Sequence, residues 1–316
     1  MRTPWTGCGT ALVTPFSAGG ALDEAGVRRL ARRQVDAGIH FLVPCGTTGE
    51  TPTLSADERR RVVELVVEEA NGRVPVLAGA GGYDTHEVID AVQTMARAGA
   101  QGILSVTPYY NKPTQEGLFQ HYRAIADSTD LPIVVYNVPG RTGVNVEAAT
   151  IVRLAAITNI VAVKEASGNM SQIVDICARV PADFIVLSGD DGITLPVMAV
   201  GGRGLISVAS NEAPGDMARL VEACERNDWD EARALNKRLL PLMTINFIES
   251  SPGPVKAAMA RMGLLDEVYR LPMVSPREDS KKKIEQVLLD LQLAAPASSD
   301  RAEPRASGAP AEARHA

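Results

Sequence analysis

Short apolar runs rich in β-branched residues recur at fairly even spacing along this 316-residue chain. Each run is followed by a loop and then by a segment with the apolar period of an amphipathic helix. Strands that alternate with helices imply parallel pairing. The pattern predicts eight strands, near residues 8–13, 39–43, 74–79, 102–106, 132–136, 160–164, 184–188 and 204–208.

Polar residues mark where several of the predicted helices begin. Ser55 is followed three residues later by Glu58, the spacing of a capping box. Further helices are predicted after Asp84 and after Thr114. Eight strands in about 210 residues fit a closed (β/α)8 TIM barrel better than an open sheet, and no glycine-rich dinucleotide fingerprint follows the first strand.

The pattern also predicts how the chain is divided. We expect the barrel to cover residues 1–225 and a C-terminal helical extension to cover residues 226–293. Residues 294–316 comprise only Ala, Pro, Ser, Gly, Arg, Glu, Asp and one His. Because this tail has nothing to bury, we predict that it is disordered.

Composition excludes several classes of protein. The net charge of -6, with scattered basic residues, argues against a nucleic-acid partner. The four cysteines form no C-x-x-C pair, which fits a cytoplasmic protein without a disulfide framework. No segment approaches the ~20 apolar residues of a membrane span, so no membrane partner is expected.

Lys164 ends the apolar run 160–163, at the carboxyl edge of a predicted strand. Active sites of such barrels lie at the carboxyl ends of the strands. In a dry site, desolvation favours a neutral lysine amine, which can attack a ketone and form a Schiff base. A lone lysine more often closes a strand by reaching solvent, so the interpretation depends on the other strand ends.

Two other strand ends carry residues that suit this chemistry. The second predicted strand is followed by the threonine turn, residues 46–50, whose hydroxyls and amides can bind a carboxylate. On its own, this motif would be interpreted as a turn that caps a helix. Tyr136 ends the strand next to that of Lys164, within reach for proton transfer. Arg141 offers a planar fork for a carboxylate, with a surface ion pair as the alternative.

A metal site is not predicted. Asp190 and Asp191 follow the seventh strand without an accompanying histidine, and they are interpreted as the acidic start of the seventh helix. The four histidines show no ligand spacing. Schiff-base chemistry requires neither a metal nor a cofactor, so none is expected.

Taken together and in this order, the motifs resemble those of the dihydrodipicolinate synthase family of pyruvate-dependent class I aldolases, over about residues 7–293. The motifs that carry the resemblance are Gly46-Thr47-Thr48-Gly49-Glu50, Thr107-Pro108-Tyr109-Tyr110-Asn111, Tyr136-Asn137-Val138-Pro139-Gly140-Arg141-Thr142-Gly143, Lys164-Glu165-Ala166-Ser167-Gly168-Asn169 and Ser188-Gly189-Asp190-Asp191.

The resemblance implies a lyase of lysine and diaminopimelate biosynthesis. Lys164 would form an imine with pyruvate, and the derived enamine would attack the aldehyde of L-aspartate 4-semialdehyde. Tyr136 would donate and accept protons, and Thr47 and Tyr110 would complete a hydroxyl relay to solvent. Because Tyr110 reaches a neighbouring subunit's site in the family, a homotetramer built as a dimer of dimers is expected.

The resemblance also assigns binding residues. Thr48 would hold the pyruvate carboxylate, and the backbone carbonyl of Ile206 would line the same site. Arg141 would bind the carboxylate of the semialdehyde. Where lysine-inhibited members tend to carry His and Asn, this chain has Ala56 and Tyr83, so weak or absent inhibition by lysine is expected.

Two alternatives stay open. Another pyruvate aldolase, such as a 2-keto-3-deoxy sugar acid lyase or N-acetylneuraminate lyase, would keep the roles of Lys164 and Tyr136 and change the acceptor. A non-catalytic metabolite-binding barrel is the alternative of a different class, since a fold alone never proves a function.

Overall fold

All eight strands are parallel and form one sheet that nearly closes on itself. In the computed structural model, which describes residues 4–295, their order is β2-β1-β8-β7-β6-β5-β4-β3. A bridge between Leu42 and Val76 joins the two end strands of this sheet. The predicted TIM barrel is thereby confirmed. The strands are β1 (Gly7–Ala11), β2 (Phe41–Val43), β3 (Leu77–Gly79), β4 (Gly102–Val106), β5 (Ile133–Asn137), β6 (Ile160–Glu165), β7 (Ile185–Ser188) and β8 (Gly204–Ser207).

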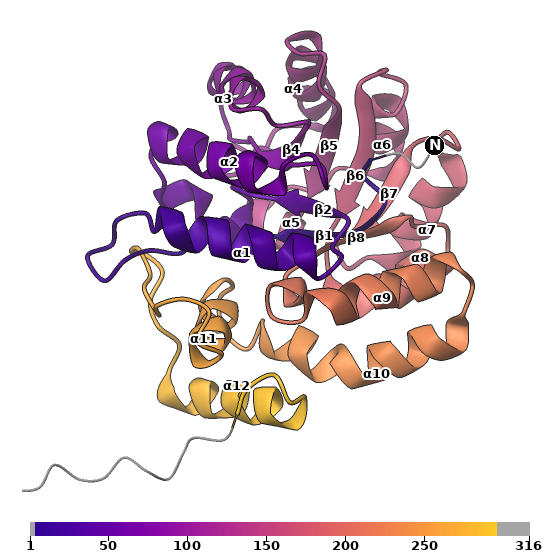
Figure 1. The fold of residues 1–316 in the computed structure, drawn as a ribbon. Helices are drawn as coiled ribbons and strands as arrows, with labels where there is room; N and C mark the ends of the chain where they lie inside the picture. Colours follow the sequence, from indigo (N-terminus) through magenta and orange to yellow (C-terminus); the bar gives the residue numbers. More distant parts are fainter. Residues whose placement is uncertain (1–3, 296–316) are drawn as a thin grey trace, which may run out of the picture.

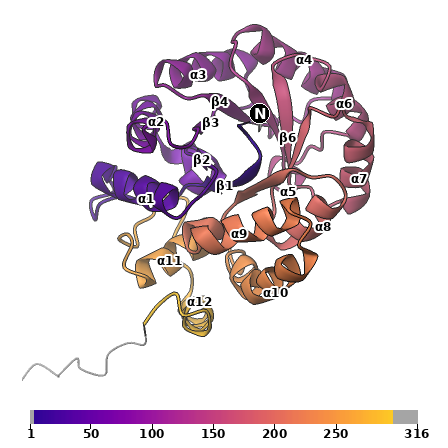
Figure 2. The same cartoon turned by 45° about the vertical axis from the view of Figure 1, so that its right-hand side comes forward.

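Helices surround the strands as a ring, which Figures 1 and 2 show from two directions. Those of the ring are α1 (Glu24–Asp36), α2 (Ala56–Ala70), α3 (Thr85–Arg97), α4 (Gln115–Asp127), α6 (Ala148–Leu154), α7 (Met170–Arg179), α8 (Thr194–Ala199) and α9 (Pro214–Glu225). The short α5 (Pro139–Thr142) follows β5 and lies inside this ring. Three further helices follow α9 in the chain: α10 (Trp229–Ile245), α11 (Gly253–Arg261) and α12 (Glu278–Asp290).

The predicted helix starts are confirmed by their caps. The Ser55 hydroxyl accepts from the Glu58 backbone N–H at 3.2 Å, and the Glu58 carboxylate accepts from the Ser55 N–H at 2.9 Å. The Asp84 carboxylate caps α3 at the N–H of His86, and the Thr114 hydroxyl caps α4. Each cap satisfies a backbone donor that the first turn leaves free.

The barrel interior is filled by side chains and closed at its amino-terminal end by Trp5. This side chain is buried and meets Phe41 edge to face, with ring centroids 5.9 Å apart. Gly102, the first residue of β4, makes the fit possible, because a Cβ there would lie 2.4 Å from Trp5 Cζ2. A second, larger apolar cluster lies between the sheet and the helices.

The helices after the barrel pack along one side of it. Helix α10 packs on α9, and α12 packs on both α10 and α11, as Figure 1 shows. The division of the chain at residue 225 stays a prediction. The predicted disordered tail, 294–316, lies outside the described residues except for its first two.

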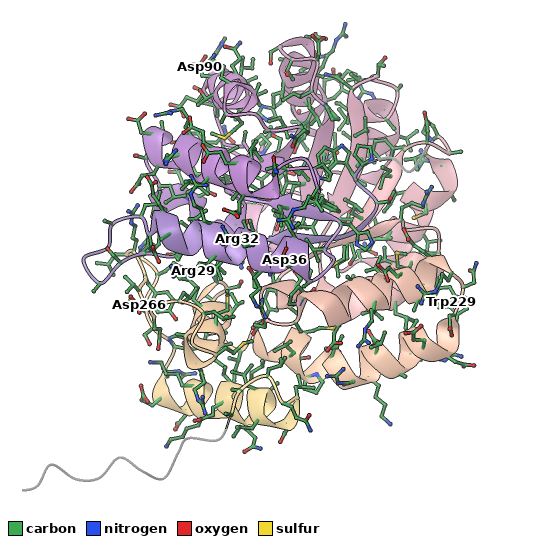
Figure 3. The ribbon with its side chains drawn as sticks, viewed as in Figure 1. Arg29, Arg32, Asp36, Asp90, Trp229 and Asp266 are labelled. Carbon is green, nitrogen blue, oxygen red and sulfur yellow. The ribbon has the colours of Figure 1, made fainter. Side chains whose placement is uncertain are left out.

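Ion pairs tie the polar sides of neighbouring helices together. Figure 3 shows Arg29, Arg32 and Asp36 along the outward side of α1. Arg32 pairs with Glu69 of α2 at 2.6 Å, and Asp36 pairs with Arg73 at 2.8 Å. Within residues 4–295, no helix is long and apolar enough to cross a lipid bilayer.

Candidate active site

Lys164 and Tyr136 are neighbours at the carboxyl ends of β6 and β5. The two residues are paired in the parallel register of these strands. Lys164 is only 6% exposed, and its Nζ lies 4.0 Å from the centroid of the Tyr136 ring. Side chains alternate along a strand, so Ala162 and Lys164 share the interior side of the barrel, whereas Val163 packs in the outer cluster. An amine is therefore held at an otherwise apolar interior position.

Backbone contacts fix the Tyr136 segment from behind. Both the N–H and the hydroxyl of Thr107 donate to the Tyr136 carbonyl, at 3.0 and 2.8 Å. The hydroxyl of Tyr122, from α4, donates to the Ser105 carbonyl at 3.1 Å. The Thr107 bonds join the ends of β4 and β5, and the Tyr122 bond joins β4 to α4, while the Tyr136 ring faces Lys164.

Gly189, after β7, leaves room for the Lys164 side chain. A Cβ at this position would lie 3.1 Å from Lys164 Cε and 2.6 Å from the Ala166 Cβ. Real Cβ atoms do not approach a neighbour as closely as the second distance. Because the glycine of the Ser-Gly-Asp-Asp motif has no side chain, it leaves the space that the Lys164 side chain occupies.

The threonine turn follows β2 as a short 3-10 turn, Thr47–Gly49. Thr48 is buried and Thr47 is half-buried. Glu50 ends the turn in the left-handed conformation, with φ 54°, and its N–H donates to the Thr47 carbonyl at 3.1 Å. Cys45, just before the turn, is buried, and burial raises the pKa of its thiol to about 12.

The other proposed site residues lie on three further elements. Ile206 on β8 is buried in the same interior cluster as Tyr136. Arg141 in α5 is exposed, and its Nη2 donates to the Ser251 carbonyl at 3.2 Å. Tyr110 lies apart from them, in the loop after β4, where its side chain is 90% exposed and its φ is 70°.

A buried polar network behind the lysine was not predicted from the sequence. Glu165 is fully buried on the outer side of β6, where its carboxylate accepts from Asn137 Nδ2 at 3.0 Å. It also accepts from the Ser167 N–H at 2.7 Å and from Gln172 Nε2 at 3.2 Å. Asn137 and Glu165 directly follow Tyr136 and Lys164, so this network fixes the ends of both strands. Asn137 and Glu165 both belong to motifs that resemble those of the family, and this was the signal from which the network could have been predicted.

Asp190 and Asp191 stand at an acidic helix start, as predicted, and Asp191 is the first residue of the short 3-10 helix Asp191–Ile193 before α8. Asp190 caps this turn, accepting from the Gly192 N–H at 2.9 Å. Asp191 is buried, and its carboxylate accepts from the Ser207 hydroxyl and from the N–H groups of Val208 and Ala209. Burial raises the pKa of Asp191, and these donors oppose the rise. Its role is to tie the end of β7 to the end of β8.

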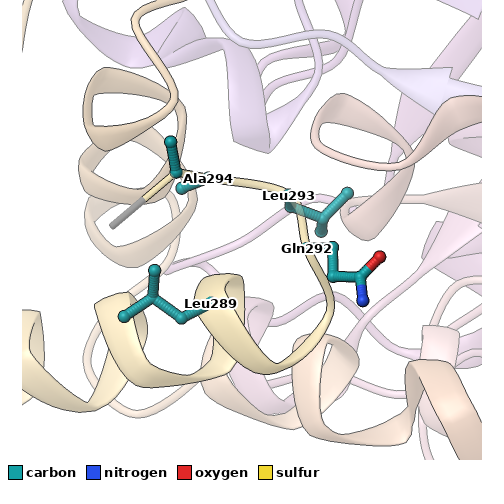
Figure 4. A pocket seen from close by; sticks show the side chains of 5 residues that line it. Leu289, Gln292, Leu293 and Ala294 are labelled. Atoms are coloured by element: carbon teal, nitrogen blue, oxygen red, sulfur yellow. The ribbon is translucent and has the colours of Figure 1, made fainter. Parts of the chain in front are cut away.

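A surface hollow at the end of α12 lies away from these residues. It is lined by Leu289, Gln292, Leu293, Ala294 and Ala295, as Figure 4 shows. None of these side chains is titratable or nucleophilic. Among residues 4–295, no group of three or more His, Cys, Asp or Glu side chains is placed to hold a metal ion.

Comparison with known proteins finds relatives that match along most of the chain. The chain is 55% identical over 282 residues to 4-hydroxy-tetrahydrodipicolinate synthase from Koribacter versatilis, covering 89% of this chain and 94% of the relative. The relative from Chlorobium phaeobacteroides is 50% identical over 289 residues, covering 91% and 97%. The crystal structure of dihydrodipicolinate synthase from Thermotoga maritima has a TM-score of 0.91 at 43% identity, covering 92% and 100%.

A TIM barrel with these relatives and a buried lysine at a strand end defines a class of enzyme, the Schiff-base-forming lyases known as class I aldolases. The family model of the dihydrodipicolinate synthetase family matches residues 4–291. The chain belongs to this family.

Proposed function

We propose that this chain condenses pyruvate with L-aspartate 4-semialdehyde, the reaction of a 4-hydroxy-tetrahydrodipicolinate synthase in lysine and diaminopimelate biosynthesis. The observation that carries the proposal is the burial of Lys164 at the end of β6 with its Nζ 4.0 Å from the centroid of the Tyr136 ring. The relative from Koribacter versatilis that bears this enzyme name matches along nearly its whole length.

The first half of the reaction activates pyruvate. Lys164 Nζ attacks the ketone carbon, and the adduct loses water to give an imine. The imine withdraws electrons from the methyl group, which loses a proton and becomes an enamine. Tyr136 donates and accepts protons in these steps, and Thr47 and Tyr110 connect it to solvent. Thr48 and the Ile206 carbonyl lie at strand ends on the same face of the barrel, where they would position the carboxylate end of pyruvate.

The second half forms the new carbon–carbon bond. The enamine carbon attacks the aldehyde of the semialdehyde, and the aldehyde oxygen takes up a proton. The amine of the bound semialdehyde then attacks the imine carbon, which closes the ring and releases Lys164 as a free amine. Arg141 binds the semialdehyde carboxylate; its contact with the Ser251 carbonyl occupies one guanidinium nitrogen and leaves donors on the others.

A complete site is proposed to need a second copy of the chain. Tyr110 is 90% exposed in a strained left-handed conformation, which fits a side chain that projects from its own subunit into a neighbouring one. We propose a homotetramer built as a dimer of dimers. A cytoplasmic location follows from the proposed biosynthetic role and from the buried free thiols of Cys8, Cys45 and Cys224.

Borohydride trapping of pyruvate tests the nucleophile. Reduction of the imine should attach one pyruvate-derived group to the wild-type chain, seen by mass spectrometry and localised to Lys164. Lys164→Ala should abolish the adduct, whereas Lys237→Ala, an exposed lysine of α10, should leave it unchanged. An unchanged adduct in Lys164→Ala would remove this lysine from its role.

A further inference from the structure

A buried ion pair joins the threonine turn to a helix more than two hundred residues away in the sequence. Lys256 Nζ of α11 donates to the Glu50 carboxylate, and both side chains are fully buried. The same Nζ donates to the Thr14 carbonyl at 3.1 Å. Burying two charges is costly unless further hydrogen bonds satisfy them, so this pair calls for a reason beyond stability.

The surroundings of Lys256 hold its amine in one place. Its Nζ lies 4.4 Å from the centroid of the Phe16 ring and 5.2 Å from that of Tyr269. Burial lowers the pKa of Lys256, and the charge of Glu50 opposes that change. The backbone N–H of Arg270 approaches the second oxygen of Glu50 at 3.4 Å. The Glu50 carboxylate is thus held from two places in the C-terminal part of the chain.

Two sets of hydrogen bonds connect Lys256 to the threonine turn, one through Glu50 and one through Thr14. Glu50 closes the turn directly, because its N–H donates to the Thr47 carbonyl at 3.1 Å. Thr14 connects Lys256 to the turn indirectly. Its carbonyl accepts from Lys256, and its hydroxyl donates to the Gly49 carbonyl at 2.7 Å. The carboxyl end of the segment that carries Thr48 is therefore held, at Gly49 and Glu50, by groups that contact one amine.

We propose that Lys256 is a positioning residue for the threonine turn, which it holds in the conformation that binds the pyruvate carboxylate. This inference rests on the proposed function and extends it to the C-terminal helices, because α11 then becomes part of the pyruvate site without touching the substrate. Lys256 acts through Glu50 and Thr14, so its loss should weaken capture of pyruvate while leaving Lys164 able to react.

A second ion pair provides a matched control. Arg270, in the connection after α11, binds the Glu58 carboxylate of α2 with its guanidinium nitrogens at 2.6 and 2.8 Å. This pair also links the C-terminal part of the chain to the barrel, but its side chains form no hydrogen bond with residues 46–50, and the Arg270 charge acts on Glu50 only through space. Replacing the Arg270 side chain leaves its backbone N–H in place.

The experiment compares two double variants, Glu50→Gln/Lys256→Met and Glu58→Gln/Arg270→Met. Each removes both charges of one pair and keeps similar side-chain volumes. The readout is the pyruvate concentration that gives half-maximal borohydride trapping. We expect it to rise about tenfold in Glu50→Gln/Lys256→Met, with full trapping at saturating pyruvate, and to stay within about twofold of wild type in the control.

Thr14→Val provides an independent variant that keeps both charges. It removes the hydroxyl bond to Gly49 and should raise the half-saturating pyruvate concentration several-fold. The proposal is overturned if wild type traps pyruvate and neither Thr14→Val nor Glu50→Gln/Lys256→Met changes the half-saturating concentration, or if the control shifts it equally. Absence of trapping in wild type would instead overturn the proposed function itself.

Discussion

At the scale of single residues, the site depends on an amine at a position that the barrel otherwise fills with apolar side chains. Lys164 follows Ala162 on the interior side of β6 and lies beside Leu187 of β7 in the strand register. The Tyr136 ring covers its Nζ, and Gly189 leaves space along its aliphatic stem. The lysine is thus confined by neighbours that provide shape rather than charge.

Gly189→Ala should disable the lysine without removing it. The added methyl group would lie 2.6 Å from the Ala166 Cβ and 3.1 Å from Lys164 Cε, so one of them must shift. We expect borohydride trapping to slow by a factor of roughly 5 to 150, because overpacking costs about 1–3 kcal/mol, the displaced lysine carries this cost into its attack on pyruvate, and 1.4 kcal/mol corresponds to a factor of ten in rate.

Gly192→Ala is the control for this substitution. The added Cβ would make only an ordinary contact, 3.4 Å from the Asp190 carboxylate, so trapping should proceed at the wild-type rate. Equal trapping rates in Gly189→Ala and Gly192→Ala would show that the glycine is not needed for the lysine's path.

Single residues were predictable from the sequence where their role depends on position along a strand. The end of an apolar run placed Lys164 at the barrel mouth, and the neighbouring strand placed Tyr136 beside it. The Asn137–Glu165 bond and the Glu50–Lys256 pair were not predicted, because each joins segments whose contact depends on the three-dimensional register. The sequence separation of the second pair is 206 residues, beyond any local pattern.

At the scale of elements, the alternation of strands and helices predicted the barrel, but strand ends differ by a few residues. The strand predicted near 74–79 begins at Leu77, because Pro75 has no N–H to donate to a ladder. Its carbonyl still accepts from the Leu42 N–H at 3.0 Å, so the barrel closes through a bridge there. Helix starts were more predictable, since caps such as Ser55 and Asp84 are local in sequence.

Helix α4 carries a buried imidazole that should make stability depend on pH. His121 is 6% exposed, and its Nδ1 lies 2.9 Å from the Thr85 hydroxyl. Burial lowers the pKa of His121 to about 4 from an ordinary value of 6.5. The unfolded chain therefore binds more protons between these values, and the free energy of unfolding should fall as the pH drops from about 6.5 to 4.

His121→Leu should remove this dependence. One pKa unit corresponds to about 1.4 kcal/mol, so the imidazole accounts for up to about 3 kcal/mol of the loss across the window. Urea unfolding at several pH values measures it, with the exposed His86→Leu as control. A variant whose unfolding free energy falls as steeply as that of wild type would contradict the assignment.

At the scale of the whole molecule, one chain holds most of the proposed site but not all of it. Lys164, Tyr136 and Ile206 share the barrel interior, whereas Tyr110 projects into solvent. The sequence pattern could place Tyr110 at a strand end, but only the resemblance to the family assigned it to a neighbouring site. Contacts between chains leave no periodic signal in a single sequence.

Mixing two inactive variants tests whether Tyr110 acts across a subunit interface. Lys164→Ala supplies a normal Tyr110, and Tyr110→Phe supplies a normal Lys164. Random reassociation makes half of the dimers mixed, each with one complete site, so activity should recover to about a quarter of wild type. Mixed dimers that form without recovered activity would place Tyr110 outside the neighbouring site.

A coupled assay measures the condensation of pyruvate with L-aspartate 4-semialdehyde. Purified chain is supplied with pyruvate, L-aspartate 4-semialdehyde and dihydrodipicolinate reductase, and the loss of NADPH is followed. We expect turnover that requires both substrates and is absent in Lys164→Ala. No loss of NADPH from a chain on which borohydride still traps pyruvate would contradict it, because the aldolase chemistry would then serve another acceptor.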